Sequence, residues 1–179
     1  MQNFIEKKFW KNKKVFITGH TGFKGSWLSL MLDSLGAQVT GFSLAPDTKP
    51  NLFNLAKIEK IIKKSIIADV RDYKKLKSEL DKSKATIVFH LAAQPLVRLS
   101  YIHPKDTFDV NFTGSLNMLQ SIKKSKKVKT GIIITTDKVY NINKNKIFRE
   151  EDELGGSDPY SASKVCVEFL FNSYQKSFF

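Results

Sequence analysis

The chain alternates short apolar runs with longer stretches in which apolar residues recur every three or four positions. The short runs are typical of buried strands, and the longer stretches are typical of helices with one apolar face. The expected strands are residues 15–18, 38–44, 65–68, 85–91 and 131–135. The expected helices are residues 26–35, a short helix within 51–64, a helix capped by Asp72, and residues 108–122 and 160–174.

The expected strands are mostly continuous apolar runs rather than strict apolar/polar alternations, so both of their faces should be buried. Strand-helix alternation of this kind predicts an α/β fold built on a doubly wound parallel sheet. The carboxyl ends of parallel strands share one edge of the sheet, and ligands bind there in doubly wound folds. The polar segment 141–158 is expected to be a long loop over that edge.

Composition narrows the class of protein. The chain has 179 residues, of which 41% are apolar, enough for one domain with a real core. No apolar run is long enough to span a membrane, so no membrane partner is expected. The single cysteine, Cys166, excludes an internal disulfide and fits a reducing cytoplasm, and we expect it to be a small buried apolar residue.

The formal charge of +13 raises the question of nucleic acid, but the pattern does not favour it. Only Arg71, Arg98 and Arg149 are arginines, and the lysines are scattered along the chain. Nucleic acid is therefore not the expected partner. A basic surface would still attract anionic ligands, including a nucleotide sugar.

A glycine-rich turn follows the first strand. Gly19, Gly22 and Gly25 are spaced three apart, between an apolar strand and a helix. Glycines there allow a tight turn, close approach of backbone to a pyrophosphate, and helix-strand packing. On its own the spacing also fits an ordinary structural turn. The cofactor-binding candidates of this segment are the three glycines with Thr21, Phe23 and Lys24.

The ends of the next strands supply further candidates. A dinucleotide fold usually has an acid at the end of the second strand, but Ser43 stands near that place and Asp47 lies beyond it. The residues alone therefore do not decide between NAD and NADP. Asp69 and Val70, after the third strand, could contact an adenine or simply form a capping turn.

The end of the fourth strand combines small residues with a histidine. Small side chains there let a cofactor approach the backbone closely, although tight packing would explain them equally. The candidates are Leu91, Ala92, Ala93 and Gln94. His90, inside the strand, is expected to be a satisfied core histidine, and no cluster has the spacing of metal ligands, so no metal is expected.

The candidate catalytic residues lie near the end of the chain. Tyr160 and Lys164 are four residues apart and share one face of the expected helix. An ammonium beside a phenol favours the phenolate, which can take a proton from an alcohol. Thr136, Asp137 and Lys138 end the fifth strand and place an acid beside a base, although a solvated turn is the alternative.

These motifs together resemble the extended short-chain dehydrogenase/reductase family. The matching elements are Thr18-Gly19-x-x-Gly22-x-x-Gly25, His90-Leu91-Ala92-Ala93 and Tyr160-x-x-x-Lys164. Within that family the motif sequences are most similar to the CDP-glucose 4,6-dehydratase branch. Lysine at position 138 favours that branch, because dTDP-glucose dehydratases have a glutamate there. The resemblance implies a Rossmann-type fold with NAD as the bound cofactor.

The resemblance also implies a reaction on a nucleotide sugar. Tyr160, activated by Lys164, would take the C4 hydroxyl proton while hydride passes to NAD. Lys138 would assist proton removal at C5, Asp137 would protonate the departing C6 hydroxyl, and Thr136 would hydrogen-bond the C4 oxygen. Return of hydride to C6 gives a 4-keto-6-deoxy sugar nucleotide. This implies a cytoplasmic enzyme of deoxysugar and lipopolysaccharide biosynthesis.

The chain departs from the family pattern at its end. Residues 1–179 are expected to be an incomplete, C-terminally truncated Rossmann domain, without the C-terminal substrate domain. The apolar residues of 165–179 are then expected to lack packing partners. A homodimer through helices 108–122 and 160–174, or association with a missing C-terminal part, is expected.

Three other functions stay open at this level. The chain could be a sugar-nucleotide epimerase or ketoreductase, which needs Tyr160 and Lys164 but not the pair at 137 and 138. It could be a non-catalytic remnant that holds a dinucleotide or nothing. It could also be a nucleic-acid binder drawn by its charge.

Overall fold

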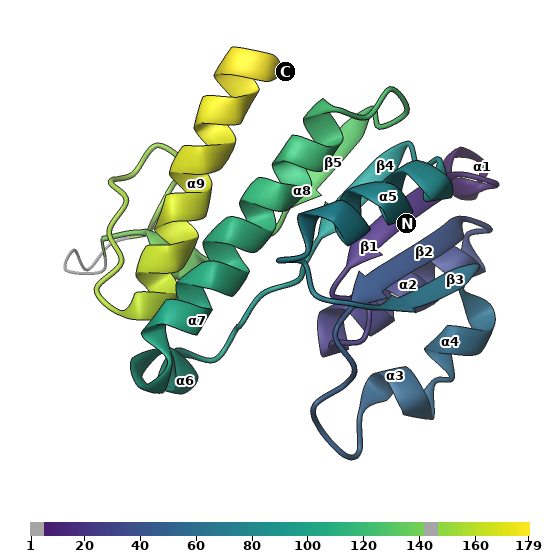
Figure 1. Cartoon of the computed structure of the whole chain (residues 1–179), viewed down its shortest axis with the longest axis horizontal. Coiled ribbons are helices and arrows are strands. Elements are labelled where there is room, and N and C mark those ends of the chain that lie inside the picture. Colours follow the sequence, from purple (N-terminus) through teal and green to yellow (C-terminus); the bar gives the residue numbers. More distant parts are fainter. Residues whose placement is uncertain (1–5, 142–146) are drawn as a thin grey trace.

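The computed structural model describes residues 6–141 and 147–179, and a parallel sheet forms its centre (Figure 1). The strands are β1 (Lys14–Thr18), β2 (Gln38–Ser43), β3 (Lys64–Ile67), β4 (Ile87–His90) and β5 (Thr130–Ile133). Their spatial order is β3-β2-β1-β4-β5, and every pairing is parallel. The predicted doubly wound parallel sheet is confirmed.

Helices cover both faces of this sheet (Figure 1). One face carries α1 (Lys7–Trp10), α2 (Phe23–Ser34), α3 (Leu52–Leu55) and α4 (Ile58–Ile61). The other face carries α5 (Tyr73–Ser83) and α8 (Gly114–Lys123). The remaining elements are α6 (Val97–Ile102), α7 (Pro104–Phe108), the π turn η1 (Asp109–Thr113), the 3-10 turn η2 (Asp137–Val139) and α9 (Pro159–Phe178), which lies beside α8.

Alternation along each strand divides the core into two clusters. In β1, Val15 and Ile17 point to the cluster under α2, α3 and α4, where they meet Leu32. Phe16 points to the opposite cluster, where it packs with Phe42 under α5 and α8. Successive strand residues face opposite sides of a sheet, so a strand buried on both faces must be apolar at every position.

Helix α2 differs from the expected one in its start and in its buried face. It begins at Phe23 rather than residue 26, and the side it buries is made of Gly25, Ser26, Ser29 and Leu32. Met31, in the expected apolar stripe, is 42% exposed. Small residues let the helix lie close to the glycine turn, so the hydrophobic pattern misses this face. The serine hydroxyls are satisfied within the backbone, since Ser29 donates to the carbonyl of Gly25 over 2.8 Å.

Other boundaries also shift. The helix expected over 108–122 is part of a longer run, in which α7, the π turn η1 and α8 follow one another without a break. The region 51–64 holds two one-turn helices separated by Lys57, whose φ is +52°. Asp72 caps α5 as expected, with its side chain accepting from the Lys75 N–H over 2.9 Å. Helices α1 and α6 were not predicted.

The last helix and the loop before it complete the description. Tyr140 and Leu154 form an antiparallel bridge that closes the base of the expected loop 141–158, of which residues 142–146 lie outside the described residues. The prediction that the apolar end of the chain lacks packing partners is wrong for Val165 and Val167, which are buried. Phe169, at 61% exposed, does lie at the surface.

Candidate functional site

A cavity of about 500 Å³ lies at the carboxyl edge of the sheet. The strand order reverses there, between β1 and β4, which is where doubly wound folds form a crevice. Every strand contributes residues at or after its end: Gly19 and 21–25 after β1, 43–47 at β2, 68–70 after β3, 91–93 and Pro95 after β4, and Ile134 and Thr135 after β5. Val110, Tyr160 and Lys164 complete the lining from helices.

The glycine turn closes one end of the cavity, and its backbone leaves no room for side chains at two positions. Gly19 has a φ of +78°, and a Cβ there would lie 2.8 Å from the Ala92 nitrogen. A Cβ on Gly25 would lie 2.0 Å from the Gly19 carbonyl oxygen. Gly22 is different, because a Cβ there meets nothing nearer than 3.4 Å. The first and third glycines therefore build the turn, and the second leaves open space before α2.

Two side chains of the turn fasten it to neighbouring strands. The Thr21 hydroxyl donates to the Leu44 carbonyl over 2.8 Å and lies 2.8 Å from the Ser43 hydroxyl. The His20 ring packs against Phe53 and hydrogen-bonds the Ser65 hydroxyl through Nε2 at 2.8 Å. Burial lowers the pKa of His20 to about 4, so this imidazole is neutral at pH 7.

Tyr160 and Lys164 reach the other end of the cavity from α9. Asp158 caps this helix, its carboxylate accepting from the Ser161 N–H over 3.0 Å. The Lys164 ammonium donates to the Ile134 carbonyl, 3.2 Å away. Burial lowers the pKa of Lys164 to about 8, although the charge of Glu168 opposes the shift. Lys164 is therefore mostly a cation at pH 7, and a cation is what stabilises a neighbouring phenolate.

A buried amide fixes α9 against the loop after β4. Asn111, in the π turn, donates to the Ser163 hydroxyl over 2.9 Å and accepts from the Gln94 N–H over 2.8 Å. Ser163 in turn donates to the Tyr160 carbonyl over 2.6 Å. Since all of these groups are buried, each bond satisfies a polar group that water cannot reach. The network sets the position of the helix turn that carries Tyr160.

His90 is a satisfied core histidine rather than a base. Its Nδ1 lies 2.7 Å from the Thr18 hydroxyl, and its Nε2 lies 3.1 Å from the Ser115 hydroxyl. The Ser115 hydroxyl donates to the Asn111 carbonyl over 2.6 Å, so Nε2–H is the donor toward Ser115. Burial, with the charge of Lys164 adding to it, lowers the pKa of His90 to about 3. The imidazole is therefore neutral and links strand β4 to Thr18 of β1 and to Ser115 of α8.

Asp69 and Val70 line the cavity at the end of β3, and the carboxylate of Asp69 also has a protein partner. Arg71 donates to it from Nε over 2.9 Å and from Nη2 over 2.6 Å. These hydrogen bonds hold the pKa of Asp69 below its usual range. Asp69 is thus an anchored anion beside the cavity, with lone pairs left to accept from a ligand.

Four of the predicted site residues are not among those that line the cavity. Gln94 is turned inward, where its side-chain amide donates to the Thr107 hydroxyl over 2.9 Å. Thr136, Asp137 and Lys138 come after the residues of β5's end that line the cavity, and the last two are exposed. The other predicted site residues, from the glycine turn to Lys164, all line this cavity.

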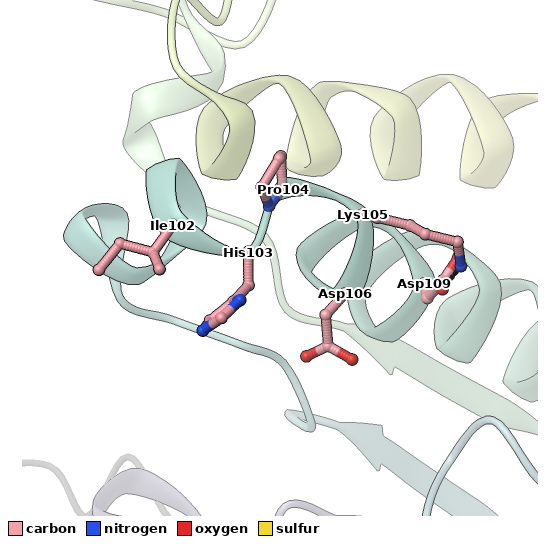
Figure 2. Close-up of a pocket in the computed structure, with 6 residues that line it drawn as sticks. All are labelled: Ile102, His103, Pro104, Lys105, Asp106 and Asp109. Atoms are coloured by element: carbon pink, nitrogen blue, oxygen red, sulfur yellow. Dashed lines mark hydrogen bonds and ion pairs between the residues drawn. The ribbon is translucent and has the colours of Figure 1, made fainter.

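A second, smaller cavity of about 370 Å³ lies where α6 meets α7 (Figure 2). Both of its carboxylates are engaged: Asp109 pairs with Lys105, and Asp106 pairs with Arg71 over 2.6 Å. Among the described residues, no group of His, Cys, Asp and Glu is arranged to hold a metal ion. In the same part of the chain, no helix has the length and apolar character to cross a membrane.

Comparison with known proteins agrees with this geometry. The model of the GDP-mannose 4,6 dehydratase family matches residues 16–179. The chain belongs to this family. The resemblance to extended short-chain dehydrogenases/reductases is thereby confirmed.

Two curated dehydratases are similar in sequence to this chain. CDP-glucose 4,6-dehydratase of Salmonella typhimurium is 45% identical over 98% of this chain and 49% of its own length. dTDP-D-glucose 4,6-dehydratase of Dictyostelium discoideum is 32% identical over 93% of this chain and 41% of its own length. The chain thus spans less than half the length of these two relatives.

Solved structures share the fold. UDP-glucose 4-epimerase of Thermotoga maritima superposes with a TM-score of 0.81 at 23% identity, over 92% of this chain and 52% of that one. The UDP-glucose 4-epimerase of Thermus thermophilus, solved with NAD, has a TM-score of 0.77 at 25% identity, over 92% of this chain and 51% of that one.

Several residues in and around the cavity were not predicted from the sequence. Val110 and Thr135 line it without having been candidates, and Asn111, Ser163 and Glu168 support it from behind. Glu168 had a readable signal, because it lies four residues after Lys164 on the same helix face. Asn111 had none, since its role depends on contacts with residues far away in the sequence.

Proposed function

We propose that this chain is the cofactor-binding part of a nucleotide-sugar 4,6-dehydratase that converts CDP-glucose to CDP-4-keto-6-deoxyglucose with bound NAD. One observation carries the proposal: the glycine turn and the Tyr160/Lys164 pair line a single cavity. The identity of 45% to the Salmonella dehydratase supports the substrate. The Thermus epimerase, solved with NAD, supports the cofactor.

The residues around the cavity fit a dinucleotide. The N-terminus of α2 opens into the cavity between Gly22 and Gly25, and unpaired N–H groups at such a terminus attract phosphate. The absence of Cβ atoms at Gly19 and Gly25 lets the turn pack tightly in front of this terminus. Asp69 and Val70 would hold the adenine end, and Leu91, Ala92 and Ala93 would pack against the cofactor from β4.

The roles given to the side chains rest on the resemblance, and the cavity lining supports them for Tyr160 and Lys164. Bound NAD would supply the hydride acceptor and donor that removal of hydride at C4 and its return at C6 of the sugar require. Tyr160 takes the C4 hydroxyl proton, and the Lys164 cation stabilises the phenolate. Thr136 hydrogen-bonds the C4 oxygen, Lys138 assists proton removal at C5, and Asp137 protonates the departing C6 hydroxyl. Gln94, whose side chain is turned inward, would contribute to cofactor binding by holding the loop after β4 in place.

The proposal also covers the substrate-binding part of the protein, its association and its location in the cell. Because the dehydratase relatives are about twice as long as this chain, the substrate-binding domain is proposed to lie in residues beyond these 179. Association with such a part, or self-association through α8 and α9, is proposed to complete the site. We place the protein in the cytoplasm, in deoxysugar and lipopolysaccharide biosynthesis, and its lone cysteine is compatible with that compartment.

Calorimetry of this chain with NAD and with NADP tests the proposal. Wild type should bind NAD, and Gly22→Leu should abolish binding while the protein stays folded, because position 22 opens into the cavity. Lys60→Leu adds the same side chain on exposed α4 and is the matched control. Absence of NAD binding by the folded wild type would overturn the proposal.

The runner-up is a sugar-nucleotide epimerase, favoured by the similarity to UDP-glucose 4-epimerases. Both functions use Tyr160 and Lys164, but only the dehydratase needs an acid and a base at 137 and 138. In a turnover assay with CDP-glucose on a protein that includes the substrate-binding domain, Lys138→Met should abolish formation of the 4-keto-6-deoxy product. Undiminished product formation by this variant would contradict the role given to Lys138.

A further inference from the structure

Glu168 stands on the same face of α9 as the two candidate catalytic residues. Tyr160, Lys164 and Glu168 follow one another at intervals of four, so they lie in line along the helix. The Glu168 carboxylate accepts a hydrogen bond from the Thr135 hydroxyl. Thr135 lines the cavity and directly follows Ile134, whose carbonyl accepts from Lys164. Two adjacent residues at the end of β5 thus hold two successive turns of α9.

The second observation is electrostatic. Lys164 is only 5% exposed, so its ammonium has lost most of its hydration. Burial lowers its pKa to about 8, and the charge of Glu168 acts in the opposite direction. Of the other titratable groups near Lys164, His90 on β4 is neutral at pH 7, and Tyr160 lies on the same helix. The turn η2 carries Asp137 and Lys138, which are exposed.

We propose that Glu168 is a positioning residue of this site, fixed by Thr135 one helical turn from Lys164, where its negative charge stabilises the buried ammonium. This role of Glu168 rests on the proposed function, because a dehydratase needs Lys164 as a cation to stabilise the phenolate of Tyr160. A merely structural Glu168 would require only its hydrogen bond with Thr135. The two roles differ in whether the charge of residue 168 matters.

The test measures the titration of Lys164 directly by NMR, following the side-chain Cε resonance that is missing from the spectrum of Lys164→Arg. Glu168→Gln keeps an acceptor for Thr135 and removes the charge. The pKa of Lys164 should then fall by roughly one unit, the effect of one charge across a partly solvated gap. Glu59→Gln, which removes an exposed carboxylate from α4, is the matched control and should leave Lys164 unchanged.

A second pair of variants covers the case in which Glu168→Gln does not fold. Thr135→Val keeps the charge but frees the carboxylate to turn toward water, so the pKa of Lys164 should fall part of the way. Thr135→Ser keeps the hydroxyl and should restore the wild-type titration. A Lys164 titration unchanged in Glu168→Gln, or unchanged in Thr135→Val, would overturn the proposal.

These measurements need no cofactor and no substrate. If NAD fails to bind but Lys164 responds to Glu168 as described, the proposed function is wrong and the coupling stands. If NAD binds and Lys164 does not respond, the function survives and Glu168 is only a structural anchor.

Discussion

The Lys164 ammonium donates a hydrogen bond to the backbone carbonyl of Ile134 at 3.2 Å, and this contact joins α9 to the carboxyl end of β5. It brings a buried cation to the edge of the sheet where the glycine turn also lies. A buried cation destabilises the folded chain unless ion pairs and hydrogen bonds offset its lost hydration. The Lys164 ammonium therefore lowers the stability of the fold, and it lies at the site where we propose that an alcohol is oxidised.

Lys164→Met should stabilise the chain at neutral pH. The pKa of Lys164 is about 8 when folded and 10.5 in the reference state, so between these values the unfolded chain binds more protons and wild-type stability rises with pH. The gain from the substitution should be at most about 3 kcal/mol at pH 7 and should shrink above pH 8. Urea unfolding at several pH values measures it. Lys176→Met, at an exposed site on α9, should give no such gain, and an equal gain there would contradict the assignment.

Acidification should destabilise the fold through two buried histidines. The pKa values of His20 and His90 are lowered to about 4 and about 3, so the unfolded chain takes up protons first as the pH falls below 6.5. The free energy of unfolding should therefore decrease between pH 6.5 and about 3, with His20 contributing down to about pH 4. Replacing His20 by alanine should flatten this decrease, whereas His103→Ala, on the exposed junction of α6 and α7, should not. The same slope in His20→Ala as in wild type would contradict the account.

The glycine turn should tolerate a methyl group at one position and not at another. Gly25→Ala places Cβ 2.0 Å from a backbone oxygen, which cannot move without opening the turn, so a loss of roughly 3 kcal/mol or more is expected. Gly22→Ala, with its nearest neighbour at 3.4 Å, should cost less than about 1 kcal/mol. Thermal unfolding of the two variants compares them. Equal costs would mean that the turn is not packed as described.

Asp158 should stabilise the helix that presents Tyr160. Its carboxylate accepts from the Ser161 N–H over 3.0 Å, and Asp158→Ala should cost about 1 kcal/mol. Burial tends to raise the pKa of Asp158, but the hydrogen bonds from Ser161 outweigh this and lower it, so the cap's charge-dependent contribution should be lost as the pH falls through that lowered value. Asp158→Asn keeps an acceptor and should retain most of the stability at pH 7. An alanine variant as stable as wild type would show that the cap is unimportant.

Local pattern was enough to predict the sheet and the two ends of the cavity. Strand β1 is apolar at successive positions because both of its faces are buried, and Gly19 and Gly25 after it are required by backbone contacts within 3 Å. Tyr160 and Lys164 are brought together by helix geometry alone. Each of these features depends on residues close in sequence.

Features that depend on distant contacts were missed. The buried face of α2 consists of small residues, so close packing rather than hydrophobicity selects it. The π turn around Asn111 is held by Gln94 and Ser163, which are far from it in the sequence. Thr135 enters the cavity because β5 ends at Ile133, two residues before the expected end.

A crystal structure of this chain with NAD tests the central claim most directly. The account predicts the pyrophosphate at the N-terminus of α2 beside Gly22, with the nicotinamide at the opposite end of the cavity facing Tyr160. A dinucleotide bound elsewhere, or one whose nicotinamide lies away from Tyr160, would contradict it.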